Sequence, residues 1–332
     1  TKYKWLETFT DSSVMDVAMN DRSVYELFES TAPLGIRPED IEGCTIGTYG
    51  LPELGTPFIQ QVLLDAKPRN FADLLQISGL SHGTDVWLGN AQELIHNGTC
   101  TISEVIGTRD NIMVYLIHQG MDEGRAFKIT ETVRKGLVAK GKVPKEDWAK
   151  MEDDMRAVNV PEWYIQSCGK IKYMFPKAHA VAYLMAAIRL MWFKLYYPVE
   201  FYATYFTVRG EAIDYEAAVG GKAVATKKLK EVTARLKIEK TAKDEELRTS
   251  LQMVSEMLAR GYEFLPIKLG ESKAKKYAVV DGKIRLPYMS LKGVGETAAM
   301  QLEKVCEENT NFLSVEDFRK ASGASSAVID TL

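Results

Sequence analysis

The chain has 332 residues, of which 46% are hydrophobic and 26% charged, and its formal net charge at pH 7 is −3. This composition is typical of a soluble globular protein of about two domains, and the overall charge predicts no partner by itself. The four cysteines lie far apart and form no C-x-x-C pair, which argues against a disulfide framework or a zinc site and favours reduced thiols in a cytoplasmic protein.

The N-terminal half of the chain predicts a series of helices. A capped helix is expected within residues 21–35, where Asp21 or Ser23 can serve as the N-cap. Pro33 and Gly35 follow the end of this helix, and the Gly- and Pro-rich stretch after it predicts a loop. Apolar residues at helical spacing then recur in six segments, namely 58–68, 71–78, 102–107, 109–120, 123–136 and 144–157.

One apolar stretch, Ala178–Tyr197, is long enough to cross a bilayer. However, His179, Arg189 and Lys194 lie within it, and a charge at the centre of a bilayer is costly. The stretch is therefore predicted to be a helix buried in protein, and no membrane partner is expected.

The last third of the chain combines helices with a small sheet. Residues 223–261 carry a charge-mixed helical pattern. Residues 276–280 and 283–286 have the pattern of two strands and are divided by Asp281-Gly282, a signal for a hairpin turn. The sequence thus predicts a mainly α protein that ends in a small mixed α/β region.

Local charge departs from the average in two places. Residues 125–145 contain seven basic side chains and one acid, and residues 163–199 contain no acid but many aromatic and basic side chains. Cations for phosphates and flat rings for bases are what a nucleic acid or nucleotide requires. A solvated basic helix beside an aromatic core is the alternative interpretation, and charge alone does not separate the two.

Helical geometry favours the nucleotide interpretation. His179 and Tyr183 are four residues apart and share a face, and Lys177 lies in the first turn of the same helix, where backbone amides favour an anion. On the helix within residues 123–136, Lys128 and Lys135 share a face, with Arg134 at its edge. A triphosphate held between these two helices would be matched electrostatically.

Catalytic motifs are absent from the sequence. There is no G-x-x-x-x-G-K-[S/T] phosphate loop, and the four histidines have no metal-ligand spacing. The one acidic cluster, Glu152-Asp153-Asp154, fits the solvated face of an amphipathic helix better than a two-metal site. We therefore assign no catalytic or metal-binding residue to this chain.

Four long segments carry a specific resemblance, namely Ser78–Ile95, Gly107–Met121, Ala126–Gly136 and Lys172–Tyr202. They resemble the PolC-type alpha subunit of bacterial DNA polymerase III, and they occur in that family's order. The resemblance extends from about Asp21 to the last residue. It implies a helical fingers domain followed by a duplex-binding region, with the catalytic aspartates of the palm and its Mg²⁺ outside this chain.

The resemblance also implies boundaries and roles. Residues 1–20 would be the end of the palm, 21–265 the fingers domain and 266–332 the duplex-binding region. The residues implied in binding the deoxynucleoside triphosphate (dNTP) are Arg134, Lys135, Lys177, His179, Tyr183, Ser81 and His82. Implied partners are primer-template DNA, dNTPs, the palm and thumb, and, for the full-length protein, the sliding clamp and replisome.

The segment Leu291–Val305 contains G-x-G-x-x-A, which is also one form of the dinucleotide-binding fingerprint. Pro287, Ser290 and Lys292 precede the glycines and are poor residues for the buried strand that a dinucleotide fold requires. The segment instead resembles a helix-hairpin-helix over residues 286–305, with a second, degenerate hairpin over 312–332. The residues implied in DNA binding are Lys292, Gly293, Val294 and Gly295, together with Lys128.

The sequence therefore predicts part of a replicative DNA polymerase that binds dNTP and primer-template DNA but does not polymerise alone. Two rivals remain at this point. One is a non-catalytic DNA-binding module built on the hairpin, and the other is an unrelated nucleotide-binding enzyme supported only by the G-x-G-x-x-A match.

Overall fold

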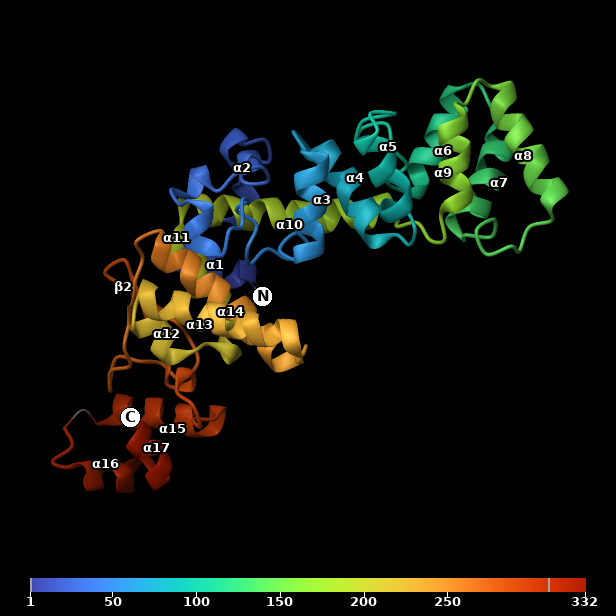
Figure 1. Ribbon diagram of the computed structural model, residues 1–332. Coiled ribbons are helices and arrows are strands. Elements are labelled where there is room, and N and C mark those ends of the chain that lie inside the picture. The colour runs from blue at the N-terminus through green and yellow to red at the C-terminus, as the bar shows by residue number, and fades with distance from the viewer. Residues whose placement is uncertain (1, 310) are drawn as a thin grey trace. The chain divides into compact units, whose positions relative to one another are not determined.

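The computed structural model describes residues 2–309 and 311–332 and is mainly helical, with one small three-stranded sheet (Figure 1). The predicted fold class is thus confirmed. The chain forms two compact units that interleave along the sequence. We call residues 19–29 and 51–188 the central unit, and residues 1–18, 30–50 and 189–332 the carboxyl-terminal unit.

The central unit is built from short helices joined by tight loops. Side-chain caps fix several helix starts: the Asn70 side chain accepts the Asp73 N–H of α4, and the Asp122 side chain accepts the Arg125 N–H of α7. Its helices are α2 (Arg22–Glu26), α3 (Pro57–Ala66), α4 (Phe71–His82), α5 (Gln92–His96), α6 (Arg109–His118), α7 (Glu123–Arg134), α8 (Lys145–Ala157), α9 (Glu162–Lys170) and the first part of α10 (Lys177–Tyr196).

The helix predicted after Asp21 is shorter than expected. Asp21 does cap it, accepting the backbone N–H groups of Ser23 and Val24, but α2 ends at Glu26. A separate 3₁₀ turn follows at Ala32–Leu34, and the Ser30 hydroxyl accepts the Ala32 N–H at its start. Local serine hydrogen bonds of this kind compete with a continuing helix.

The carboxyl-terminal unit is also mainly helical. The α13 and α14 helices pack along each other, and α1 packs against α11. The unit contains α1 (Lys2–Thr10), the last part of α10, α11 (Pro198–Arg209), α12 (Tyr215–Val219), α13 (Lys222–Ile238), α14 (Ala242–Ala259), α15 (Glu296–Glu308), α16 (Val315–Ser322) and α17 (Ser326–Thr331).

The small sheet has the strand order β1-β3-β2. The predicted hairpin is confirmed: β2 (Ala278–Val280) pairs antiparallel with β3 (Lys283–Arg285). Asp281 and Gly282 between them have φ of 49° and 73°, which is the left-handed backbone of a type I′ turn. Strand β1 (Phe264–Leu265) adds parallel to β3, and its two residues are too few to give a strand pattern in the sequence.

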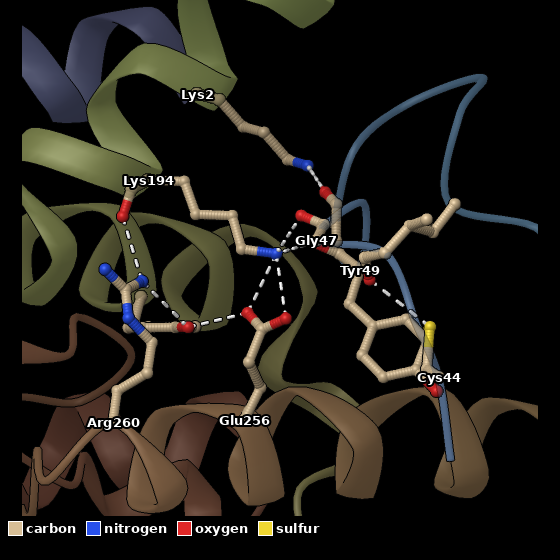
Figure 2. Close-up of polar contacts among 10 residues, drawn as sticks. Lys2, Cys44, Gly47, Tyr49, Lys194, Glu256 and Arg260 are labelled. Atoms are coloured by element: carbon tan, nitrogen blue, oxygen red, sulfur yellow. Dashed lines mark hydrogen bonds and ion pairs between the residues drawn. The ribbon is translucent and has the colours of Figure 1, made fainter. Parts of the chain in front are cut away.

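The core of the carboxyl-terminal unit contains a buried ion pair (Figure 2). The Lys194 Nζ lies 2.8 Å from Glu256 Oε1 and also donates to the carbonyl oxygens of Gly47 and Tyr49, each at 2.8 Å. The Tyr202 hydroxyl donates to Glu256 at 2.6 Å. Lys194 and Glu256 are fully buried, so each depends on the other for the polar partners that water would otherwise supply.

The α10 helix is continuous from Lys177 to Tyr196, as predicted to within one residue at each end. Among the described residues it is the one helix that length and composition would allow to cross a membrane, and 44% of its most apolar window is buried inside the protein. The lysine within its last turn, Lys194, is neutralised by Glu256. The Lys194 ammonium group, which lies in an otherwise apolar stretch, therefore has an acidic partner in the protein core.

Candidate functional site

Residues 172–176 join three elements that carry predicted site residues. The Lys172 N–H donates to the Thr84 carbonyl at 3.0 Å, and the Thr84 N–H donates to the Tyr173 carbonyl at 3.0 Å. The Met174 N–H donates to the Arg134 carbonyl at 3.3 Å. The segment therefore lies against the C-terminal ends of both α4 and α7, and it leads directly into the N-terminus of α10.

A glycine makes the approach to α7 possible. Gly136 has a φ of +65°, and a Cβ atom at this position would lie 2.1 Å from the Lys172 carbonyl oxygen. No side chain fits into that space. The sequence Arg134-Lys135-Gly136 thus places two basic residues beside the segment that leads to α10 because the third residue has no side chain.

Four rings form a row along the start of α10. The ring centroids are 5.0 Å apart for His82 and Phe175, 5.1 Å for Phe175 and His179, and 4.6 Å for His179 and Tyr183. His179 and Tyr183 share a face of the helix, as their spacing predicts, and Tyr183 is 46% exposed. An exposed row of rings beside basic side chains provides flat surfaces on which a base can stack.

His82 is held by a carboxylate that the sequence gave no reason to select. Its Nε2 lies 2.7 Å from Glu53 Oε2. Glu53 has a φ of +67°, a strained conformation for a residue with a side chain, and it lies in the Gly- and Pro-rich loop. Strained backbone persists where the surroundings determine it, and here the contact with His82 is one such constraint.

The predicted basic pair at the end of α7 is partly neutralised. The Arg134 Nε and Nη2 each donate to one oxygen of Glu131 at 2.8 Å, and the Lys135 Nζ lies 3.3 Å from the same carboxylate. The hydrogen bonds from Arg134 lower the pKa of Glu131 from 4.5 to about 2. A ligand phosphate would therefore have to share the Arg134 guanidinium with Glu131 or displace that carboxylate.

An acidic side chain also occupies part of the α10 N-terminus. The Lys177 backbone N–H donates to Asp110 Oδ2 at 3.1 Å. The helix start thus already binds one carboxylate, which agrees with its preference for anions and leaves fewer amides for a phosphate than the sequence suggested. The Lys177 side chain itself is exposed, and within the described residues it makes no hydrogen bond or ion pair.

Two predicted residues contribute less than the others to this arrangement. The Ser81 hydroxyl donates to the Ser78 carbonyl at 3.0 Å, within its own helix. Lys128 lies exposed on α7, two turns before Lys135, and within the described residues its side chain makes no hydrogen bond or ion pair. It is available to a polyanion that extends along α7, but it does not belong to the cluster around residues 172–176.

The predicted DNA-binding hairpin has a glycine turn but only one full helix. Gly293 has a φ of +87°, and Gly295 is the N-cap of α15. Where the first helix was expected, the chain forms a 3₁₀ turn at Tyr288–Ser290. Since a 3₁₀ turn and not a buried strand precedes the glycines, the loop does not have the setting of a dinucleotide-binding fingerprint.

The hairpin residues divide by exposure. Lys292, Gly293 and Gly295 are exposed, whereas Val294 is buried in a cluster formed by α15, α16 and α17 together with Leu291 and Tyr288. Val294 therefore stabilises the hairpin by packing, and the residues around it are those that can reach a ligand. In the second hairpin, α16 and α17 are joined through Gly323, which has a φ of +62°.

The acidic cluster of α8 does not have the form of a magnesium site. Asp154 forms an ion pair with Arg125, and Asp153 lies 3.0 Å from Arg156. Within the described part of the chain, no group of three His, Cys, Asp or Glu side chains is placed to hold a metal ion. These carboxylates are neutralised by arginines, and we assign Mg²⁺ to none of them.

Comparison with known proteins identifies the chain's relatives. Residues 5–159 match the bacterial DNA polymerase III alpha subunit finger domain. The whole chain is 46% identical to "DNA polymerase III PolC-type" of Bacillus cereus, 44% identical to that of Bacillus subtilis and 45% identical to that of Caldanaerobacter subterraneus subsp. tengcongensis. The chain is thus similar along its whole length to part of PolC-type DNA polymerase III. It spans about 22% of the length of the first two of these relatives and 23% of the third.

The match to the finger domain covers part of the candidate site. Ser81, His82 and the α7 basic residues lie inside residues 5–159, whereas His179, Tyr183 and the hairpin lie beyond them. The relatives named above extend over all of these positions. The ring row therefore continues from the matched domain into α10.

We predict that the Glu131–Arg134 pair stabilises the chain above about pH 4.5 and ceases to do so as the pH falls toward 2. The pKa of Glu131 is lowered on folding, so the unfolded chain takes up the proton first and the contribution disappears with acidification. Glu131→Gln should cost about 1 kcal/mol near neutral pH. Urea unfolding of both proteins between pH 2 and 7 measures the difference, and a difference that stays constant over this range would contradict the prediction.

Proposed function

We propose that the chain is the nucleotide- and DNA-contacting part of a replicative DNA polymerase. The observation that carries this proposal is the meeting of Arg134, His82 and the start of α10 around residues 172–176, in a chain that contains a DNA polymerase III finger domain. Rings and fixed cations on rigid helices are the groups that position a dNTP.

Each part has a distinct role in this proposal. Arg134 and Lys135 bind the triphosphate once it replaces Glu131 as their partner, and Lys177 adds charge at the start of α10. His179 and Tyr183 contact the base or sugar, and Glu53 orients His82 beside them. Ser81 and Lys128 line the approach to this cluster, and Lys128 contacts the DNA backbone.

The chemistry itself belongs to the full-length protein in this proposal. The primer 3′ hydroxyl attacks the dNTP and pyrophosphate leaves, with Mg²⁺ bound by palm carboxylates stabilising the developing charge. This chain supplies binding, orientation and phosphate neutralisation, and alone it does not polymerise. Its partners are the palm and thumb, and through the full-length protein the sliding clamp and replisome, in the cytoplasm.

The DNA duplex is proposed to contact the hairpin. Lys292 and the amides around Gly293 and Gly295 are exposed and placed before a 13-residue helix, an arrangement suited to a DNA phosphate. Residues 286–332 carry four basic and seven acidic side chains, so bulk charge contributes little there. The alternative, a DNA-binding module without a nucleotide site, uses this hairpin alone.

Titration of the chain with primer-template DNA, with and without a matched dNTP, tests the proposal. We expect binding that weakens with salt and that the dNTP strengthens. Arg134→Ala and His179→Ala should each weaken the dNTP effect about tenfold, as loss of a charge-assisted or stacking contact implies. Arg156→Ala is the matched control, since Arg156 is also an acid-paired arginine of the central unit.

The outcomes separate the two functions. A DNA affinity that changes neither with the dNTP nor with any of the three substitutions would favour the hairpin module. An equal effect of Arg134→Ala and Arg156→Ala would mean that only net charge matters. Primer extension by this chain with Mg²⁺ would overturn the assignment of chemistry to the palm.

A further inference from the structure

The carboxyl-terminal unit contains a cavity of about 720 Å³ that the proposed nucleotide site does not use. Its walls come from the end of α11, the loop before α12, the helices α13 and α14, and the inner side of the hairpin. This volume is within the range of cavities that hold a nucleotide-sized molecule.

One side of the cavity is aromatic and apolar. Tyr215 contributes a half-buried ring, and Leu247 and Met289 add half-buried apolar surface. Phe206 and Tyr277, whose ring centroids are 5.6 Å apart, also line the cavity but are almost fully buried. The backbone at Tyr277 is fixed, because its N–H donates to the Thr207 hydroxyl at 3.1 Å. A fixed wall of this kind suits a planar ring system.

The polar side of the cavity has cations without matching acids. Four lysines and three acids line it, and one of these lysines already satisfies two of the acids. The Lys228 Nζ lies 2.7 Å from Asp214 and 2.7 Å from Glu216. The remaining lining charges are Lys243, Lys275, Lys292 and Glu211.

Those remaining lysines are available to a ligand. Within the described residues, Lys243 and Lys292 make no hydrogen bond or ion pair through their side chains, and both are exposed. Lys275 has a distant partner, with 3.9 Å between its Nζ and Glu296 Oε2. The cavity lining thus has three lysines for the one remaining acid, Glu211, and this excess of positive charge favours binding of an anion.

We propose that this cavity binds a nucleoside phosphate, with the base on the apolar side against Tyr215 and the phosphate between Lys243 and Lys292. The site lies in a different unit from Arg134 and His179, so it stands independently of the dNTP site proposed above, but it shares Lys292 with the proposed DNA contact of the hairpin. The nucleoside phosphate is either a free nucleotide or the terminal nucleotide of a DNA strand. Because Lys292 and Gly293 form both the cavity wall and the hairpin, an occupied cavity restrains the hairpin loop.

The probe for this site is 2-aminopurine deoxynucleoside 5′-monophosphate, whose fluorescence is quenched when its base stacks. We expect saturable quenching by the intact chain. The double substitution Lys243→Ala with Lys292→Ala should weaken binding at least about tenfold. Leu247→Trp fills the cavity without changing charge and should weaken binding similarly, with circular dichroism to verify the fold.

Two controls separate this site from other sources of quenching. Lys227→Ala with Lys230→Ala removes the same charge from exposed positions on α13 that do not line the cavity, and should leave binding unchanged. Arg134→Ala should remove only the quenching that arises at the proposed dNTP site, and the saturable quenching that depends on Lys243 should remain. The proposal is overturned if quenching is not saturable, if both lysine pairs weaken it equally, or if Arg134→Ala abolishes it.

A second arm identifies the source of the nucleotide. The same base is placed at the 5′ end of a single-stranded oligonucleotide and titrated into the same variants. Tighter binding than that of the free monophosphate, still sensitive to Lys243 and Leu247, identifies a DNA strand end. Equal or weaker binding of the strand identifies a free nucleotide, and both results support the site.

Discussion

Lys194→Met is expected to lower the free energy of unfolding by about 3–5 kcal/mol, the cost of leaving one member of a buried ion pair alone. Among the described residues, the substitution leaves the buried Glu256 carboxylate with the Tyr202 hydroxyl as its one remaining donor. It also removes the donor to the carbonyl oxygens of Gly47 and Tyr49. Urea unfolding followed by tryptophan fluorescence measures the change, since Trp192 lies on the same helix.

A double-substitution cycle tests whether the pair is the cause. Lys194→Met combined with Glu256→Gln should cost less than the sum of the two single changes, because neither residue is then left charged without its partner. Lys222→Met is the control, since the Lys222–Asp40 ion pair is exposed and should cost less than about 1 kcal/mol. If the losses in free energy of unfolding add up in the Lys194–Glu256 cycle, the loss in Lys194→Met does not come from the broken ion pair.

The same pair has a local consequence. Lys194 holds the loop around Gly47 and Tyr49 through backbone carbonyls, and Arg260 donates to the Lys194 carbonyl at 2.9 Å (Figure 2). Loss of the ammonium group should therefore release this loop before the rest of the unit unfolds. Faster amide hydrogen exchange in residues 44–50 of the variant, at pH 7, is the expected observation.

Much of the fold could be predicted because its signals are local. The α10 helix has an uninterrupted apolar pattern, and the β2–β3 hairpin has an Asp-Gly turn between two strand-like segments. The partner of Lys194 could not be predicted in the same way. Glu256 is 62 residues away on α14, and no local sequence pattern predicts which charged residues of two distant helices form an ion pair.

The candidate site was predictable to a similar extent. The pairing of Arg134 and Lys135 with Glu131 follows from helical spacing, and so does the shared face of His179 and Tyr183. Glu53 and Asp110 were missed because both reach the site from other elements. A carboxylate in a Gly- and Pro-rich loop has no periodic neighbours that would indicate its contact with a distant histidine.

Gly136→Ala is expected to destabilise the chain by about 2–4 kcal/mol, combining a strained left-handed backbone with overlap against a neighbouring carbonyl. Its Cβ would lie 2.1 Å from the Lys172 oxygen, and backbone on both sides leaves little freedom to adjust. To relieve the overlap, the end of α7 must move away from residues 172–176. Thermal unfolding of the chain measures this cost.

The change at Gly136 should also weaken nucleotide binding, because it separates Arg134 from the ring row without removing any side chain from either. Gly141→Ala is the matched control: Gly141 has the same φ of +65°, but a Cβ there would meet nothing within 4 Å. The control carries only the backbone strain, so it should cost about 1 kcal/mol and leave the dNTP effect intact. Equal losses in the two variants would mean that strain alone matters, and that the contact between α7 and Lys172 does not position the site.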